Sequence, residues 1–128
     1  MVFPEELLYT KDHEWVRIEG DTATVGITAF AQNELGDIVY VEIETLDQSV
    51  ERNGIFGTVE AVKTVSDLFM PIAGTIVEVN EALADEPELV NTDPYGAGWM
   101  IKLKLEEDAN AADLLAAADY KKQVGADA

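Results

Sequence analysis

Apolar and polar residues alternate over several short stretches of this chain, and a period of two is typical of half-buried β-strands. The clearest alternation covers residues 99–105, where four apolar side chains stand two positions apart: Trp99, Ile101, Leu103 and Leu105. Residues 14–27 predict a hairpin of two strands around a turn at 19–21. Further strands are expected over residues 37–44 and 54–79, so the middle of the chain is predicted to be mostly β.

Helical signals are fewer than strand signals. Thr28 is a good N-cap for a helix over residues 29–35, and Gly36 is suited to end that helix. Residues 81–98 are rich in turn formers and acids, and they predict a surface connection with one helical turn. Residues 108–124 predict an amphipathic C-terminal helix, because alanine and leucine recur there at helical spacing.

Many short strands joined by glycine-containing turns, with little helix, favour a compact β-sandwich or flattened β-barrel over a βαβ fold. The chain of 128 residues is long enough for one hydrophobic core and too short for two domains of ordinary size. We therefore expect a single domain over residues 1–128, with its core at about 7–105 and the C-terminal helix at about 108–124.

The charge and the missing cysteines narrow the classes of function. The chain has 26 acidic and 8 basic side chains, and its net charge of −18 would repel nucleic acid and anionic membranes. Without cysteine, any redox chemistry must come from a bound group. No apolar run has the length of a membrane-spanning helix and the first residues do not resemble a signal peptide, so a cytoplasmic location is expected.

The side chains that most enzymes need are missing from the sequence. There is no Gly-rich phosphate loop, nucleophile elbow or cluster of metal ligands. His13 stands beside Glu14 and has the chemistry of a general base, but a lone histidine near a tryptophan is more often a packed structural residue. The sequence therefore predicts a protein that is not an enzyme and has no metal site.

Lys63 is the one residue whose setting suggests chemistry. It is the only basic residue between Arg52 and Lys102, an interval with eight acids. Residues 55–59 and 65–70 read as paired strands, so residues 61–64 are expected to form the turn between them. An amine at such an exposed tip suits a covalent carrier, whose attached group visits separate active sites. On spacing alone, an ordinary solubilising lysine is the preferred interpretation.

Acylation of this lysine would remove its positive charge, because the product is a neutral amide. Glu60 and Asp67 would then form a negative frame around the attached group. Such a frame is a candidate recognition feature for the enzyme that modifies Lys63.

Several blocks of the sequence resemble, in the right order, those of the glycine cleavage H-protein family. The blocks are YTKDHEWV at 9–16, VGITAFAQNELGDIVYVEI at 25–43, GTVEAVKTVSD at 57–67, PIAGTIVEVN at 71–80 and ELVNTDPYGAGWMIK at 88–102. This resemblance implies a barrel-sandwich hybrid fold of the lipoyl/biotinyl-carrier type, with short helices and a C-terminal helix. It also implies that Lys63 carries lipoate in amide linkage on a hairpin turn.

The same resemblance implies a carrier that shuttles between enzymes and is not itself a catalyst. Glycine decarboxylase (P protein), which uses pyridoxal phosphate, would load an aminomethyl group from glycine, and the aminomethyltransferase (T protein) would unload it. Dihydrolipoamide dehydrogenase (L protein) would reoxidise the arm, and a lipoate ligase or a lipoyl/octanoyltransferase would attach it. An acidic carrier that visits several enzymes is expected to be a monomer.

A loaded arm is labile in water, so it should dock in a cleft that limits solvent access. We expect this cleft to involve Glu14, Ile27, Glu34, Leu35 and Asp67. The alternative is that the two apolar residues pack in the core and the three acids are solvated surface.

Three alternatives to this carrier remain at the level of the sequence. A biotinyl carrier typically has methionines beside its lysine, whereas Lys63 is flanked by Val62 and Thr64. The lipoyl domains of 2-oxo acid dehydrogenases are shorter and lack the DPYGAGW block at 93–99 and the C-terminal helix. The third alternative is an unmodified interaction module of the same fold, or a protein that passes lipoate to other acceptors.

Overall fold

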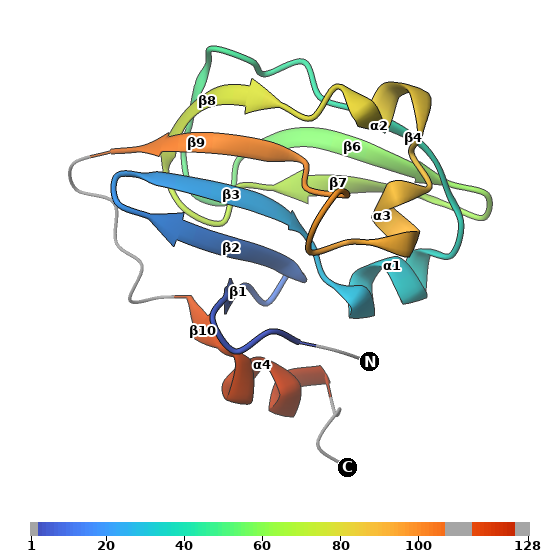
Figure 1. Cartoon of the computed structure of the whole chain (residues 1–128), viewed down its shortest axis with the longest axis horizontal. Coiled ribbons are helices and arrows are strands. Elements are labelled where there is room, and N and C mark those ends of the chain that lie inside the picture. Colours follow the sequence, from blue (N-terminus) through green and yellow to red (C-terminus); the bar gives the residue numbers. More distant parts are fainter. Residues whose placement is uncertain (1–2, 107–113, 125–128) are drawn as a thin grey trace.

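The structure is a computed structural model that describes residues 3–106 and 114–124. Within these ranges the strands form two sheets in which all neighbouring strands are antiparallel (Figure 1). The spatial order of the larger sheet is β10 (Leu115–Ala116), β1 (Leu8–Tyr9), β2 (Glu14–Glu19), β3 (Thr22–Ile27), β9 (Ile101–Leu105), β8 (Gly74–Val79) and β5 (Ser49–Val50). The order of the smaller sheet is β4 (Ile38–Glu42), β6 (Ile55–Ala61) and β7 (Val65–Phe69). The helices are α1 (Ala29–Leu35), α2 (Ala82–Asp85), α3 (Leu89–Thr92) and α4 (Ala117–Val124).

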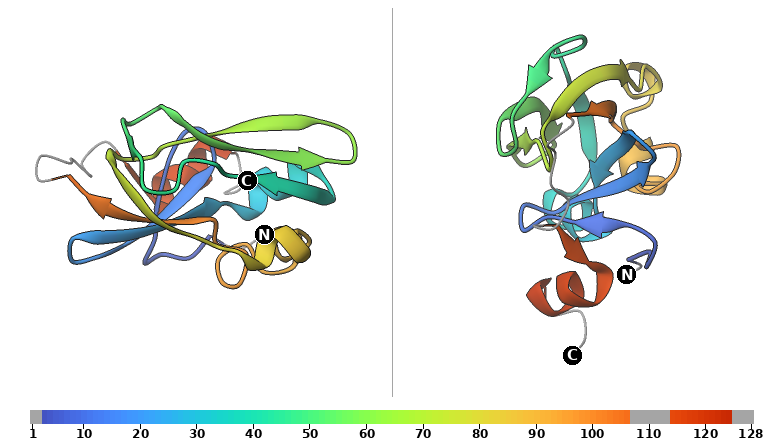
Figure 2. Two further views of the ribbon diagram at one scale, coloured as in Figure 1. Left: turned by 90° about the horizontal axis from the view of Figure 1, so that it is seen from above. Right: turned by 90° about the vertical axis from the view of Figure 1, so that its left-hand side faces the viewer.

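The two sheets pack against each other as two layers, which are visible edge-on in Figure 2. One cluster of buried side chains joins them, with Val25 and Ile101 from the larger sheet and Phe56 and Val59 from the smaller. The sheets do not close into a continuous barrel. This arrangement confirms the predicted mostly-β, flattened barrel-sandwich fold.

The predicted hairpin is formed by β2 and β3, with residues 14–19 paired to residues 22–27, and Glu19, which was expected in the turn, is the last residue of β2. Trp15 is fully buried on this hairpin, and its indole N–H donates to the Pro94 carbonyl at 2.9 Å. Gly26 lies opposite Trp15, and a Cβ at Gly26 would stand 2.7 Å from the indole ring. The glycine therefore makes room for the largest side chain of the core.

Helix α1 begins and ends where the sequence predicts. The Thr28 hydroxyl accepts a hydrogen bond from Ala31 N at 3.2 Å, which satisfies one of the free donors at the helix start. Gly36 ends the helix with a φ of 83°, and its N–H donates to the Gln32 carbonyl. A residue with a Cβ is strained in this conformation, so glycine is required at this position.

Two regions differ from the prediction. Residues 81–98 contain two short helices, α2 and α3, where one turn was expected, because Leu83 and Val90 each bury a side chain and hold their turns against the core. The C-terminal helix begins at residue 117, since residues 115–116 instead pair with β1 at the edge of the larger sheet. Residues 108–113 of the predicted helix lie outside the described residues.

Met100 also differs from the alternating pattern, because it stands between Trp99 and Ile101, on the side of the pattern that Lys102 and Lys104 share, and yet is fully buried. Strand β9 begins only after Met100, so this side chain is not bound by the strand's alternation.

Helix α4 packs at the end of the molecule that carries β1 and β10 (Figure 1). The Tyr120 ring stacks on the Tyr9 ring with 4.8 Å between centroids. The Tyr120 hydroxyl lies 2.8 Å from the Thr28 hydroxyl and 2.8 Å from His13 Nδ1. The C-terminal helix is thereby tied to the start of α1 and to the loop before β2.

Candidate functional site

Lys63 lies in the turn between β6 and β7, as the sequence predicts. The Ala61 N–H donates to the Thr64 carbonyl at 2.8 Å and closes the turn, while the Lys63 side chain is exposed. The β6–β7 hairpin extends beyond the larger sheet at the end of the molecule near α1 (Figures 1 and 2). The amine is therefore presented to solvent from a paired, ordered hairpin.

The turn that holds Lys63 rests on the segment after α1. The Val62 N–H donates to the Asp37 carbonyl at 3.1 Å, and Ile38 pairs with Ala61 at the start of β4. A Cβ placed on Gly36 would stand 3.4 Å from Lys63 Cε, which shows that the lysine stem lies over this glycine. Residues 36–38 thus form a platform beneath the lysine turn, and we call them the platform segment.

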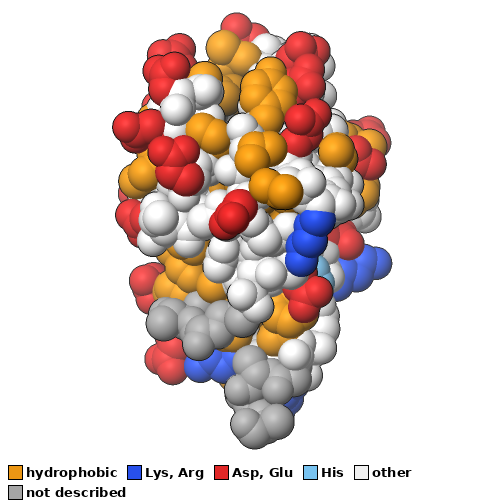
Figure 3. Space-filling view, turned by 90° about the vertical axis from the view of Figure 1, so that its right-hand side faces the viewer, with side chains coloured by type: hydrophobic (Ala, Val, Ile, Leu, Met, Phe, Trp, Pro, Cys, Tyr) orange, Lys and Arg blue, Asp and Glu red, His pale blue; other side chains and the backbone are white. Residues whose placement is uncertain are grey.

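The surface around the turn combines apolar and acidic side chains. Val62 and Val65 are 75% and 62% exposed, and cross-strand pairing places Tyr40, Glu60 and Val65 in one row across the smaller sheet. Figure 3 shows hydrophobic side chains on this end of the molecule with acidic side chains around them. Of the two acids of the predicted frame, Glu60 is half-buried and Asp67 is exposed.

Two further carboxylates crowd the edge of this surface. Glu42 and Glu44 lie so close that a hydrogen bond between them and their mutual repulsion raise the pKa of Glu42. A basic partner surface would relieve this repulsion.

Glu14 is the most perturbed carboxyl group of the site. It is only 2% exposed, its Oε1 accepts from the Thr10 hydroxyl at 2.9 Å, and its Oε2 accepts from Phe69 N at 3.3 Å. Burial raises the pKa of Glu14 to about 8, although both hydrogen bonds favour the ionised form. Glu14 thus links the start of β2 to the end of β7 and holds its proton near neutral pH.

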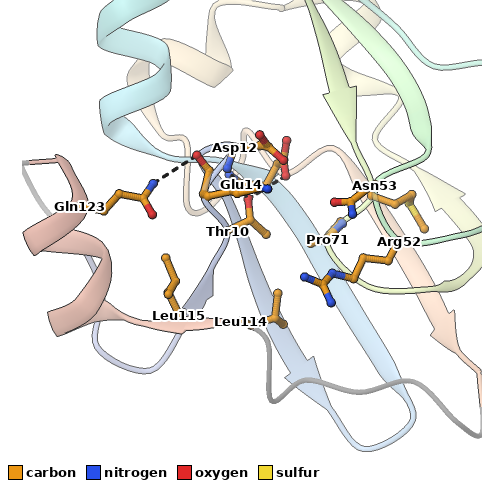
Figure 4. A pocket seen from close by; sticks show the side chains of 11 residues that line it. Thr10, Asp12, Glu14, Arg52, Asn53, Pro71, Leu114, Leu115 and Gln123 are labelled. Atoms are coloured by element: carbon orange, nitrogen blue, oxygen red, sulfur yellow. Dashed lines mark hydrogen bonds between the residues drawn. The ribbon is translucent and has the colours of Figure 1, made fainter.

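Glu14 also forms part of the wall of a cavity of about 190 Å³. The other walls come from the loop before β2, the loop around Arg52, Pro71 and the C-terminal segment at Leu114 and Gln123 (Figure 4). The sequence suggested that the acids of the predicted cleft were either docking groups or solvated surface, and for Glu14 the solvated interpretation is wrong.

The other cleft candidates lie at different depths. Ile27 is the cross-strand partner of Glu14 and belongs to the hydrophobic core, while Leu35 is partly buried against that core. Glu34 is exposed at the end of α1, and its charge acts on His13. Asp67 is exposed on β7, two residues from the N–H that binds Glu14. The structure brings Glu14 and Ile27 together and leaves Glu34 and Asp67 on the surface.

His13 has the structural setting that the sequence favours. Its ring is half-buried and contacts the Phe30 ring at 4.8 Å between centroids, besides its hydrogen bond to Tyr120. Burial lowers the pKa of His13, which keeps the ring neutral at physiological pH.

Asn91 is a residue of this region that sequence reasoning did not single out. Asn91 lies on α3, and its side chain forms hydrogen bonds with the backbone of Gly36 and of Ile38. The available signal was its place in the ELVNTDPYGAGW block, but spacing alone does not show which segment it contacts.

Two classes of site are not found in the part of the chain that the structure describes. No group of three or more His, Cys, Asp or Glu residues there could hold a metal ion. No helix of those residues is long and apolar enough to cross a membrane.

A flattened barrel-sandwich fold with an exposed lysine on a projecting hairpin turn defines the class of carrier domains that attach a prosthetic group to lysine. Residues 7–127 match the family model described as glycine cleavage H-protein. The chain therefore belongs to the glycine cleavage H-protein family, and it is a lipoyl-carrier component of the glycine cleavage system.

Individual relatives agree with this assignment. The chain is 53% identical over 125 residues to a glycine cleavage system H protein of Staphylococcus carnosus, covering 98% of this chain and 99% of the relative. It is 57% identical over 124 residues to one of Bacteroides thetaiotaomicron, covering 97% and 98%. The crystal structure of a glycine cleavage system H protein from Mycobacterium marinum superposes with a TM-score of 0.88 at 43% identity, covering 96% of this chain and 99% of that one.

Proposed function

We propose that Lys63 is the residue of this chain that carries lipoate, through an amide bond to its amine. The observation that carries this proposal is the exposed Lys63 side chain on a turn held by hydrogen bonds within the hairpin and to Asp37. The room above Gly36 accommodates the methylene stem, so the amine is free to react without movement of the backbone. When bound, lipoate supplies the disulfide chemistry that this cysteine-free chain lacks.

We further propose that the chain serves its enzymes as a non-catalytic carrier. Its partners would be glycine decarboxylase, the aminomethyltransferase, dihydrolipoamide dehydrogenase and the enzyme that attaches lipoate. The acidic surface around the lysine turn and the net charge of −18 support brief encounters with basic docking surfaces, because charge complementarity raises association rates more than affinity. A monomer suits this role, and the cytoplasmic location stays a prediction from the sequence.

Mass spectrometry provides the direct test of the attachment site. We expect protein made with lipoate and a lipoate ligase to gain one lipoyl increment, which peptide mapping assigns to Lys63. A biotin increment would instead support a biotinyl carrier, and an unmodified Lys63 beside an active ligase would support the unmodified interaction module. An increment on another lysine would contradict the proposed site.

The loaded arm would be protected in a cleft between the lysine turn and Glu14. Strand β7 runs from the turn to Phe69, and its four residue steps from Val65 cover about 13 Å at 3.3 Å per residue. A lysine side chain extended by the lipoyl acyl chain spans a comparable distance, so its far end reaches the neighbourhood of Glu14. In this proposal the buried carboxyl of Glu14 binds the positively charged amino end of the arm, Asp67 and Glu34 flank the arm at the surface, and Leu35 and the core residue Ile27 supply apolar packing.

Substitution of the cleft acids tests this arrangement. We expect Glu14→Ala to shorten the lifetime of the loaded arm in water more than Glu34→Ala does, because Glu14 is buried and Glu34 is exposed. The lifetime is measured as ammonia release from isolated loaded protein, and the Glu14 carboxyl signal is followed by NMR in unloaded and loaded protein. Unchanged lifetimes in both variants would remove these two residues from the proposed cleft.

A further inference from the structure

The side-chain amide of Asn91 forms hydrogen bonds with both ends of the platform segment at residues 36–38. Asn91 Oδ1 accepts from Ile38 N at 2.8 Å, and Asn91 Nδ2 donates to the Gly36 carbonyl at 2.8 Å. The same Nδ2 also donates to Gln32 Oε1 at 2.9 Å. The backbone N–H of Ile38 fixes the orientation of this amide, because an N–H requires an oxygen opposite it.

These hydrogen bonds lie on both sides of Asp37, the residue that contacts the lysine turn. Asp37, whose carbonyl accepts from Val62 N, lies between the two backbone groups that Asn91 binds. Gly36, on which the Lys63 stem lies, is one of the two. A short chain of hydrogen bonds therefore runs from α3 through the platform segment to the turn.

Helix α3 is itself well anchored. Val90, next to Asn91, is fully buried in the core, and the Leu89 carbonyl accepts from Asp93 N at 2.8 Å to end the helix. Asn91 thus connects the anchored helix α3 to the platform segment, on which the projecting lysine turn rests.

We propose that Asn91 is a positioning residue for the modification of Lys63. It fixes the platform segment, and this holds the lysine turn in the conformation that the lipoate-attaching enzyme recognises. Asn91 does not touch the reacting amine and acts through residues 36–38. This inference rests on the proposed attachment of lipoate to Lys63, and it assigns a function in that reaction to the ELVNTDPYGAGW block at residues 88–99.

The chain contains a matched control for Asn91. Asn80 also uses its amide to bind backbone, because Nδ2 donates to the Ala97 and Trp99 carbonyls at 2.8 and 2.7 Å and Oδ1 accepts from Ala82 N at 3.2 Å. These three partners of the Asn80 side chain lie outside the platform segment and the lysine turn. Asn91→Ala and Asn80→Ala therefore each remove a side-chain amide that makes three hydrogen bonds. Only Asn91→Ala removes hydrogen bonds to the platform segment beneath Lys63.

The experiment compares initial rates of lipoylation of the unmodified full chain by a lipoate ligase with lipoate and ATP. We expect Asn91→Ala to lower kcat/KM about tenfold relative to the unsubstituted chain, on the order of one lost hydrogen bond, while Asn80→Ala changes it less than about twofold. Thermal unfolding of both variants measures how much stability each substitution removes, apart from any effect on lipoylation. Equal rate losses in the two variants, or no loss in Asn91→Ala, would overturn the proposal.

Hydrogen exchange gives a second readout that needs no enzyme. We expect the Val62 amide to exchange faster in Asn91→Ala and to stay protected in Asn80→Ala, because only the first variant frees the Asp37 carbonyl to move. Equal protection of Val62 in both would overturn the proposal. Should Asn91→Ala fail to fold, Asn91→Ser takes its place, since a serine hydroxyl is too short to reach both backbone groups. If the unsubstituted chain itself takes no lipoate, the proposed function fails, and Val62 exchange still decides whether Asn91 holds the turn.

Discussion

Lys63→Arg is expected to abolish lipoylation while the protein stays folded. Arginine keeps the positive charge at the turn, but its guanidinium stays protonated and does not form the amide. The turn is held by backbone groups, namely Ala61 N to Thr64 O and Val62 N to Asp37 O, so the substitution leaves these hydrogen bonds in place. We expect a change in the free energy of unfolding of less than about 0.5 kcal/mol, as for other exposed substitutions.

The measurements are intact mass after incubation with a lipoate ligase, glycine decarboxylation with the partner enzymes, and thermal unfolding. Lys104→Arg is the matched control, because Lys104 is also exposed but lies on β9 in the larger sheet. The control should acquire one lipoyl group and support glycine cleavage. A folded Lys63→Arg protein that gained a lipoyl group or sustained glycine cleavage would contradict the assignment of Lys63.

The parts of the structure that local patterns determine could be predicted from the sequence. The lysine turn follows from two apolar stretches that flank residues 61–64, and the structure closes this turn at the expected residues. Helix α1 follows from Thr28 and Gly36, because capping depends on side chains and dihedral angles within a few residues. The hairpin of β2 and β3 likewise follows from two apolar stretches joined by a short turn.

The parts that depend on distant contacts could not be predicted in this way. The depth of Glu14 arises because the end of β7, more than fifty residues later in the chain, covers it and supplies the Phe69 N–H. The contact of Asn91 with residues 36–38 similarly joins two segments that spacing does not relate. Both residues stood in recognisable blocks, yet neither their burial nor their partners have a local signature.

The C-terminal segment shows a competition between local and tertiary preferences. Its alanines and leucines favour helix throughout, but Leu115 and Ala116 pair with β1 and extend the larger sheet. The edge of β1 would otherwise present unpaired backbone groups, and pairing satisfies them. Among the described residues of this segment, the helix begins at Ala117, where Ala117 and Tyr120 pack in an apolar cluster.

Glu14→Gln is expected to stabilise the protein increasingly as the pH rises. The pKa of Glu14 is about 8 in the folded protein and near 4.5 for an ordinary glutamate, so the folded state holds a proton that the unfolded state releases. The free energy of unfolding therefore falls with rising pH between these two values and does not recover at higher pH. Glutamine resembles the protonated carboxyl and does not titrate, so the free energy of unfolding of the variant does not fall in this way.

The geometry of the site suits this replacement. The glutamine carbonyl can keep one of the two hydrogen bonds that Glu14 accepts, from the Thr10 hydroxyl or from Phe69 N, and the amide has nearly the size and shape of the carboxyl that it replaces. Each pKa unit corresponds to about 1.4 kcal/mol, so the advantage of the variant should grow by roughly 3 kcal/mol from about pH 5 to pH 8. Urea unfolding of both proteins across this range measures it.

An exposed glutamate serves as the control for Glu14→Gln. Glu5 contacts water in the folded and unfolded states, so Glu5→Gln should give no gain of this size at any pH. A difference between Glu14→Gln and the unsubstituted chain that stays constant with pH would show that the Glu14 proton is not held by burial. The stabilised Glu14→Gln variant is then tested for protection of the loaded arm. A loss of protection would explain why the chain has a carboxyl here that lowers its stability at neutral pH: the negative charge of Glu14 binds the cationic arm, and this binding favours ionisation of the carboxyl.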